Sequence, residues 1–257
     1  MIPSPIRKVL SSMNDHRVRA LLMGGQACVL YGAAEFSRDA DFAILADSRN
    51  LRRLAGALES LDAVPIAVPP CELGFLRRGH AVHFRCRHSE ALRMRVDVMA
   101  RMRGVDTFTK LWRRRSTFDL GRGFRCDALG LADLVVAKKT QRDKDWPMIR
   151  RLVEANYFEN RRDPAPAQVS FWLRELRSSE LLCAVAKRHH GAAIRAARKR
   201  PLIRAALEGR SAALEAELRA EELREREIDR GYWTPLKAEL RALARRGRRS
   251  GSGPRAR

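Results

Sequence analysis

Apolar positions follow two different periods in the first part of the chain. Residues 20–23 form a short apolar run, whereas leucines at positions 51, 54, 58 and 61 recur at helical spacing. Apolar residues at every third or fourth position favour a helix, and short runs or strict alternation favour a strand. The pattern predicts helices at 6–15, 26–33 and 51–61, with strands at 20–23 and 39–46.

Two aspartates alternate with apolar residues at the start of the second predicted strand. The stretch reads DADF from Asp39, and Gly24-Gly25 separates the first strand from the helix that follows it. Because strand side chains repeat every two residues, Asp39 and Asp41 share one face. Carboxylates held this close favour a cation between them. Gly24 and Gly25 predict a turn before a helix, where backbone N–H groups can bind a triphosphate at close range.

A third acidic position lies on a later strand. Residues 94–99 read MRVDVM and alternate strictly around Asp97. We expect a strand here, another at 64–68, and a hairpin with arms at 73–76 and 81–87 around a turn at 77–79. A carboxylate on a neighbouring strand would complete a metal site with Asp39 and Asp41, as phosphoryl and nucleotidyl transfer require.

The second half of the chain has helical character. A helix is expected from Leu131, and Asp145 with Pro147 is typical of the start of the next one. The proline-rich stretch 161–166 indicates a linker. We therefore expect one domain at 1–160, a wholly helical region at 167–247 and a disordered basic tail at 248–257.

Charge favours a polyanionic partner. The 257 residues contain 52 Lys and Arg against 30 Asp and Glu, which gives a net charge of +22. Residues 187–257 hold 20 basic and 9 acidic residues, half of the excess. Such an imbalance is most simply explained by nucleic acid, and the alternative is a solvated basic surface.

Cysteine usage and hydropathy indicate a cytoplasmic, soluble protein. The five cysteines are scattered without paired spacing, which is typical of a reducing compartment. The first residues contain no apolar core of signal-peptide length, and no apolar run approaches a membrane span. We therefore expect no membrane partner.

A cluster of histidines and cysteines invites comparison with a zinc site. Its members lie between Cys71 and His88 and include His83 and Cys86. On a strand, Cys86 and His88 share one face while His83 points to the other. The spacing does not favour zinc, and a hairpin facing the substrate is the preferred interpretation.

The acidic pattern resembles that of the polymerase-β-type nucleotidyltransferase superfamily. Gly24-Gly25, thirteen further residues, Asp39 and Asp41, and a later Asp97 between valines carry the resemblance, over roughly residues 18–145. It implies an α+β fold whose core, within 1–160, is a mixed β-sheet flanked by helices. It also implies a bound NTP with two Mg²⁺ ions, held by Asp39 and Asp41. Asp97 would be the third ligand and the base.

A narrower resemblance links residues 131–146, LADLVVAKKTQRDKDW, to the AbiEii-type abortive-infection nucleotidyltransferases. In that group a lysine and a following Arg and Asp lie near the nucleotide. The resemblance carries this role to Lys138 or Lys139, Arg142 and Asp145. The spacing of four and seven residues places Lys138, Arg142 and Asp145 on one helix face, provided that the helix continues.

Three positions beside the glycines and aspartates differ from that group. Glu35 and Ser37 stand where an Arg and a Thr commonly precede the aspartates, and Gln26 follows the glycines. We expect Gln26 and Ser37 to lie at the nucleotide. Neither residue indicates which base is bound.

The expected activity is Mg²⁺-dependent transfer of NMP from an NTP to a hydroxyl group. The basic C-terminal region favours RNA as acceptor, such as a tRNA end. A toxin-like role with a cognate antitoxin is compatible with the narrower resemblance. The alternatives are transfer to a small molecule such as an antibiotic, transfer to a protein side chain, or a nucleic-acid-binding or antitoxin-like partner without turnover.

Overall fold

The computed structural model describes residues 4–34, 37–121 and 123–249. The chain separates into two compact units, which are considered one at a time. The first unit holds the described parts of Met1–Leu30, Ala34–Ala137 and Gly231–Arg257. The second unit holds Tyr31–Ala33 and Lys138–Arg230.

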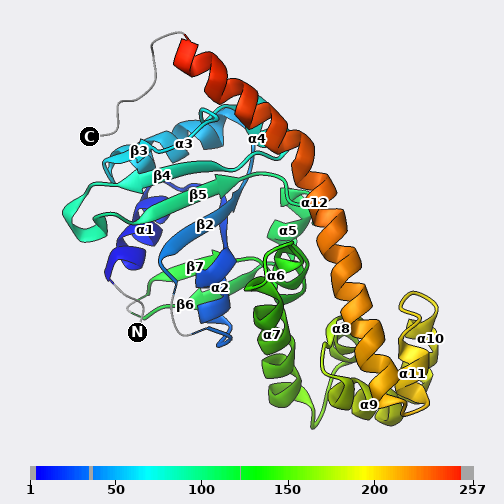
Figure 1. The fold of residues 1–257 in the computed structure, drawn as a ribbon. Coiled ribbons are helices and arrows are strands. Elements are labelled where there is room, and N and C mark those ends of the chain that lie inside the picture. Colours follow the sequence, from blue (N-terminus) through cyan, green and yellow to red (C-terminus); the bar gives the residue numbers. More distant parts are fainter. Residues whose placement is uncertain (1–3, 35–36, 122, 250–257) are drawn as a thin grey trace. The chain divides into compact units, whose positions relative to one another are not determined.

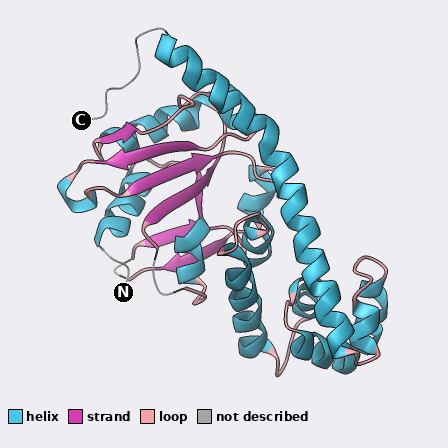
Figure 2. Cartoon of the chain, in the orientation of Figure 1, coloured by secondary structure: helices cyan, strands magenta, loops and turns pink. Residues whose placement is uncertain are grey.

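The first unit is built on a mixed sheet, drawn in magenta in Figure 2. Within the described residues the sheet has seven strands in the order β3-β4-β5-β2-β1-β7-β6. Strand β2 pairs antiparallel with β1 and parallel with β5. The strands are β1 (Ala20–Met23), β2 (Asp39–Ile44), β3 (Ala63–Pro65), β4 (Val82–Cys86), β5 (Arg95–Met99), β6 (Ser116–Asp119) and β7 (Arg125–Ala128).

The two central strands have one apolar face and one acidic face. Ala40 and Phe42 of β2 and Val96 and Val98 of β5 are buried in the core. Because side chains alternate along a strand, the aspartates between these residues project to the opposite face. The packing of the core thus determines on which side of the sheet the carboxylates gather.

Helices flank this sheet, and the turn into α3 shows how sequence determines their ends. Asp47 caps α3 by accepting a hydrogen bond from the Asn50 backbone N–H at 2.7 Å. The buried Asn50 amide in turn donates to the carbonyls of Arg19 and Leu45. The helices are α1 (Ser4–Asp15), α2 (Gly24–Leu30), α3 (Ser48–Glu59), α4 (Leu73–Arg78), η1 (Ser89–Ala91), α5 (Phe108–Arg113) and α6 (Leu131–Lys138).

The described part of the second unit is helical. Its core includes Trp172, whose indole N–H donates to the Asn156 side-chain oxygen at 2.9 Å. Its helices are α7 (Asp145–Asn160), α8 (Pro166–Glu175), α9 (Ser179–Arg188), α10 (His190–Ala197), α11 (Ile203–Leu207) and the beginning of α12 (Ser211–Arg249).

Helix α12 contributes to both units, since its residues from Gly231 onward belong to the first unit. There Glu239 accepts a hydrogen bond from Arg78 Nη2 at 2.7 Å. The Nε2 atom of His80, whose side chain is buried, also lies 2.7 Å from the Glu239 carboxylate. These contacts attach the later part of α12 to the segment between α4 and β4.

The structure confirms the predicted fold class, since the chain is α+β, with a mixed sheet flanked by helices and a helical region after it. The two units differ from the predicted domain ranges. Residues 138–160 lie in the helical unit, and 231–249 lie in the unit of the sheet. No described helix is both long and apolar enough to span a bilayer.

Two local predictions are wrong, and a third depended on a condition that is not met. Residues 73–76 belong to helix α4, not to a hairpin arm, because Gly79 adopts φ 104° and its N–H closes the helix onto the Leu76 carbonyl. The helix from Leu131 ends at Lys138 and a new helix begins at Asp145, so Lys138 and Asp145 do not share one helix face. Arg248 and Arg249 of the predicted tail belong to α12, and 250–257 lie outside the described residues.

Candidate active site

The three predicted aspartates lie on neighbouring strands of the first unit. Asp41 of β2 is the register partner of Asp97 of β5. Asp39 lies two residues before Asp41 on β2, so the side chains of Asp39 and Asp41 project from the same face. Figure 1 shows β2 beside β5 in the sheet. The side chains of register partners project from the same face of a sheet. The three aspartates therefore share one face of the sheet.

Asp97 is held by two basic side chains. Its Oδ1 atom lies 2.8 Å from Arg95 Nε and 2.9 Å from His83 Nδ1. Arg95 Nη2 also lies 3.0 Å from His83 Nδ1, so this nitrogen donates to Asp97 in one tautomer and accepts from Arg95 in the other. Burial raises the pKa of Asp97, but the contacts with His83 and Arg95 outweigh it and hold the pKa below its ordinary value.

Arg95 is a cation on this acidic face. It stands in register with Asp39, and its hydrogen bond to Asp97 raises its pKa, as does the attraction of Asp97, Asp39 and Asp41. Burial acts in the opposite direction. The sequence prediction missed Arg95, although the alternation in MRVDVM places it on the face of Asp97. It missed the role of His83 too, because that role depends on the pairing of β4 with β5.

The glycine pair lies against the acidic face. Gly24 has φ +67°, and a Cβ atom there would lie 1.9 Å from Asp41 Oδ2. A Cβ atom on Gly25 would lie 2.6 Å from Ser37 Oγ, which itself donates to the Asp39 carbonyl at 3.2 Å. Glycines are thus required because the Asp41 and Ser37 side chains approach the backbone here.

Ser37 and Gln26, which are also predicted to bind the nucleotide, differ in burial. Ser37 is half-buried beside Gly25, at the edge of the acidic face. Gln26 is buried within α2, and its side-chain nitrogen has no hydrogen-bond partner among the described residues. Contact of either residue with a nucleotide stays a prediction, and Glu35 lies outside the described residues.

The donor atoms of the acidic face suit a divalent cation of the Mg²⁺ type, because carboxylate oxygens are its preferred protein ligands. Among the described residues, however, no three His, Cys, Asp or Glu side chains form a ready metal-holding group. The contact between Arg95 and Asp97 explains part of this difference, since Asp97 Oδ1 is already engaged. A metal would have to share Asp97 with Arg95 or displace it.

The histidines and cysteines between Cys71 and His88 do not form a zinc site in the structure. No zinc-type cluster exists within the described residues, where His83 contacts Asp97 and His80 contacts Glu239. Cys86 is a buried free thiol on β4, and burial raises its pKa to about 11. A thiol with so high a pKa is a poor metal ligand and a poor nucleophile at neutral pH.

The second unit contains the other predicted cluster. Asp145 accepts from Lys138 Nζ at 2.9 Å, from Thr140 Oγ1 at 2.6 Å and from Arg142 Nε at 2.8 Å. The loop between α6 and α7 brings these residues together, and the continuous helix that would have placed Lys138, Arg142 and Asp145 on one face is not formed. Burial raises the pKa of Asp145, but Lys138, Thr140 and Arg142 outweigh it and lower the pKa overall.

Both predicted lysines form ion pairs within the second unit. Lys138 is buried against Asp145, and Lys139 Nζ lies 2.8 Å from the carboxylate of Glu175. Thr140 was not predicted, yet its carbonyl also accepts from the Trp146 indole N–H at 2.8 Å. The cluster thus fixes the loop at the start of α7, and the predicted contact of Lys138, Lys139, Arg142 and Asp145 with a nucleotide stays a prediction.

A hollow of about 420 Å³ also lies in the second unit, between α7 and the first part of α12. Trp146, Arg177 and Arg226 are among its lining residues, and both guanidinium groups lie over the Trp146 ring. None of the lining residues belongs to the predicted site. Its arginines alternate with carboxylates, as where Arg226 pairs with Asp143.

No family model and no curated protein matches the chain. A solved structure from H. pylori, provisionally described as a nucleotidyltransferase, is similar to it with 12% sequence identity. The alignment covers 87% of this chain and 94% of that one, with a TM-score of 0.38.

Proposed function

We propose that the chain is a nucleotidyltransferase that moves NMP from an NTP to a hydroxyl acceptor and releases pyrophosphate. The observation that carries this proposal is the register of Asp41 with Asp97, with Gly24 packed against the Asp41 carboxylate. Carboxylates on adjacent strands beside a glycine turn provide the ligands for divalent cations and room for a polyphosphate.

In the proposed reaction, the acceptor oxygen bonds to the α-phosphorus and the bond from that phosphorus to the pyrophosphate oxygen breaks. Asp39, Asp41 and Asp97 would hold Mg²⁺, which would neutralise the phosphate charge when bound. Asp97 would also accept the hydrogen bond of the attacking hydroxyl, and then its proton. Its carboxylate is held in the ionised form by His83 and Arg95, which lower its pKa, and an ionised carboxylate has an oxygen that can accept a hydrogen bond from the hydroxyl.

The test uses variants that preserve side-chain shape. Asp39→Asn with Asp41→Asn should abolish transfer of label from each α-labelled NTP to a mixture of cellular RNA, protein and small molecules. Asp15→Asn, an exposed aspartate at the end of α1, is the matched control and should retain full activity. Undiminished labelling by the double variant would refute the proposal.

We also infer that RNA is the acceptor, and a tRNA end is the first substrate to test. The net charge of +22 supports a polyanionic acceptor more than an antibiotic or a protein side chain. The labelled fraction in the same experiment identifies the acceptor class. Label confined to small molecules or protein would overturn the choice of RNA and leave nucleotidyl transfer intact.

A second candidate function is nucleic-acid binding without turnover. The contact of Arg95 with Asp97 favours it, because this cation occupies an oxygen that a metal would use. Calorimetric titration with each NTP, with and without Mg²⁺, separates the two functions. A protein that only binds nucleic acid should show no metal-dependent affinity for any NTP.

A further inference from the structure

Cations are distributed unevenly over the helices of the second unit. Residues 181–207, which include most of α9 and all of α10 and α11, contain seven basic and no acidic residues. Residues 211–230, the first part of α12, contain four basic and seven acidic residues. The positive charge of the second unit is therefore concentrated on the three short helices and not on this part of α12.

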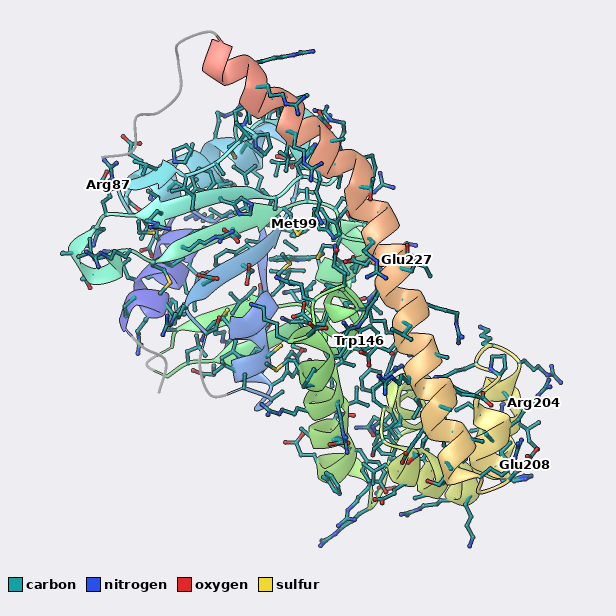
Figure 3. The ribbon with its side chains drawn as sticks, viewed as in Figure 1. Arg87, Met99, Trp146, Arg204, Glu208 and Glu227 are labelled. Carbon is teal, nitrogen blue, oxygen red and sulfur yellow. The ribbon has the colours of Figure 1, made fainter. Side chains whose placement is uncertain are left out.

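The basic residues of 181–207 are also available to solvent. Six of the seven are exposed, and none of these six forms an ion pair within the part of the chain that the structure describes. The six are Lys187, Arg188, Arg195, Arg198, Lys199 and Arg204. Figure 3 labels Arg204 on α11 and Glu208 just beyond that helix. The seventh, Arg200, is buried and pairs with Glu221 at 2.7 Å.

The arginines of α12 are in a different setting. Arg226 pairs with Asp143 and with Glu222, and Arg230 pairs with Glu227. Neighbouring carboxylates neutralise these cations and would repel a polyanion. A polyanion that approaches the second unit is therefore attracted to α9–α11 and not to the first part of α12.

An exposed aromatic residue adjoins these cations. The Arg188 guanidinium donates to the carbonyls of Arg161 at 2.9 Å and Arg162 at 3.1 Å, which brings the end of α7 beside the end of α9. Arg161 lies over the Phe158 ring at 5.3 Å, and Phe158 is 53% exposed. Exposed rings beside arginines provide stacking platforms for unpaired bases.

We propose that this surface binds the phosphodiester backbone of a single-stranded nucleic acid. It is named the basic face and consists of the six exposed cations together with Arg161, Arg162 and Phe158. Release of condensed counterions from the phosphates drives such binding, and Phe158 adds base stacking. The inference rests on the proposed function in one respect, since the basic face would hold the acceptor of nucleotidyl transfer.

The test compares two variants that lose equal charge. Arg195→Gln/Arg198→Gln/Lys199→Gln removes three cations of the basic face, and Arg219→Gln/Arg224→Gln/Arg230→Gln removes three exposed arginines of α12. Anisotropy of a labelled single-stranded RNA is measured over a salt series. The first variant should bind about tenfold more weakly near 0.1 M salt, with a log–log salt slope reduced by roughly 2, at about 0.7 per lost phosphate contact. The α12 variant should bind within about twofold of the unmodified chain.

Three additional arms define the ligand. Phe158→Ala should weaken binding of single-stranded RNA more than binding of duplex RNA, because only unpaired bases stack. DNA of the same sequence tests the role of the ribose, and binding of RNA alone or of both supports the proposal. Polyglutamate that competes as well as RNA at equal charge would overturn it, since simple anion attraction would then suffice.

Two further outcomes would overturn the proposal that the basic face binds RNA, provided that circular dichroism shows all variants to be folded. One is equal weakening of RNA binding by both triple variants, and the other is unchanged RNA binding by the first variant. Binding is measured without NTP, so the two proposals fail separately. RNA binding through the basic face with no nucleotide transfer would refute the enzymatic proposal alone. Transfer to RNA that survives loss of the basic face would refute the statement that this face holds the acceptor and would leave the enzymatic proposal intact.

Discussion

Gly24 and Asp41 are in such close contact that no other residue fits at position 24 without a shift. The position combines φ +67° with a carboxylate oxygen 1.9 Å from where a Cβ atom would lie. The glycine turn and the metal-type carboxylate of the proposed active site are therefore parts of one packed contact. A change in either displaces the other.

Gly24→Ala should destabilise the fold more than a glycine substitution that brings strain alone. Gly32→Ala is the control, because Gly32 has φ +71° with no atom within 4 Å of its Cβ position. Gly32→Ala should lower the free energy of unfolding by about 1 kcal/mol, because alanine is strained in the left-handed backbone conformation. Gly24→Ala should lower it by at least about twice as much. Urea denaturation measures both. Equal losses would show that the Asp41 side chain moves away at no cost.

Arg95→Ala should tighten the binding of Mn²⁺, used as a spectroscopic substitute for Mg²⁺. The change removes a positive charge 2.8 Å from Asp97, so the acidic face becomes more negative. We expect the affinity for Mn²⁺ to rise by about tenfold, which is less than the full repulsion between two charges at close range would give. Electron paramagnetic resonance counts free Mn²⁺ without any need for activity. Arg87→Ala, an exposed arginine after β4, controls for net charge. Weaker binding would show instead that Arg95 orients Asp97 as a ligand.

Asp145→Asn should be strongly destabilising at neutral pH and much less so in acid. The side chain is buried with Lys138, so its loss leaves a buried ammonium without a counter-charge, at a cost of about 3–5 kcal/mol. The pKa of Asp145 in the folded chain is below the ordinary value of an aspartate, so its stabilisation is complete above that ordinary pKa and is lost as pH falls through the folded pKa.

The measurement is urea denaturation at about pH 7 and about pH 3. The difference in free energy of unfolding between Asp145→Asn and the unmodified chain should be smaller at the lower pH than at neutral pH. Asp163→Asn, at an exposed aspartate of the second unit, is the control and should show a small effect at both. A difference independent of pH would show that packing rather than charge stabilises this cluster.

Glu239→Gln should loosen the end of α12. Glu239 accepts hydrogen bonds from Arg78 and from the buried His80. Both contacts lower the pKa of Glu239, and the contact with His80 has the larger effect. Loss of its charge weakens both contacts, so backbone amides of residues 232–246 should exchange faster with deuterium. Glu217→Gln, at an exposed position on the same helix, should leave exchange unchanged. Protection that stays the same would mean that apolar packing alone holds this part of α12.

The sequence alone predicted the parts of the site that depend on local periodicity. Alternation placed Asp39 and Asp41 on one face, and the same rule on residues 94–99 placed Asp97 on a strand of its own. The close approach at the glycines also followed from local chemistry, but helix α2 begins at Gly24 and not, as predicted, at Gln26. Leucine spacing correctly indicated the helix that became α3.

The contacts between segments could not be predicted in this way. His83 meets Asp97 only because β4 pairs with β5 in one register, and this register depends on the packing of the whole sheet. The resemblance named Lys138, Arg142 and Asp145, and helical spacing would have joined them only if the helix had continued. A loop assembles the cluster instead and brings Thr140 to Asp145 as well.

Short segments were the least predictable. Residues 73–78 read LGFLRR, an apolar run that fits a strand arm or a single helical stretch equally well. The glycine that follows them decided for the helix, since it ends helices as readily as it makes turns. Net charge likewise predicted a basic region, but not that the first part of α12 would be acidic within it.

Helix α12 makes the first unit discontinuous in sequence. The chain leaves that unit after Ala137 and returns to it at Gly231, so most of the second unit is an insertion between two parts of the first. A fragment that ended at the proline-rich stretch 161–166 would contain every strand but would lack Glu239. The buried Nε2 atom of His80 would then have lost its carboxylate. Completion of the first unit therefore waits for nearly the whole chain, and during synthesis Asp97 is made well before the part of α12 that belongs to the same unit.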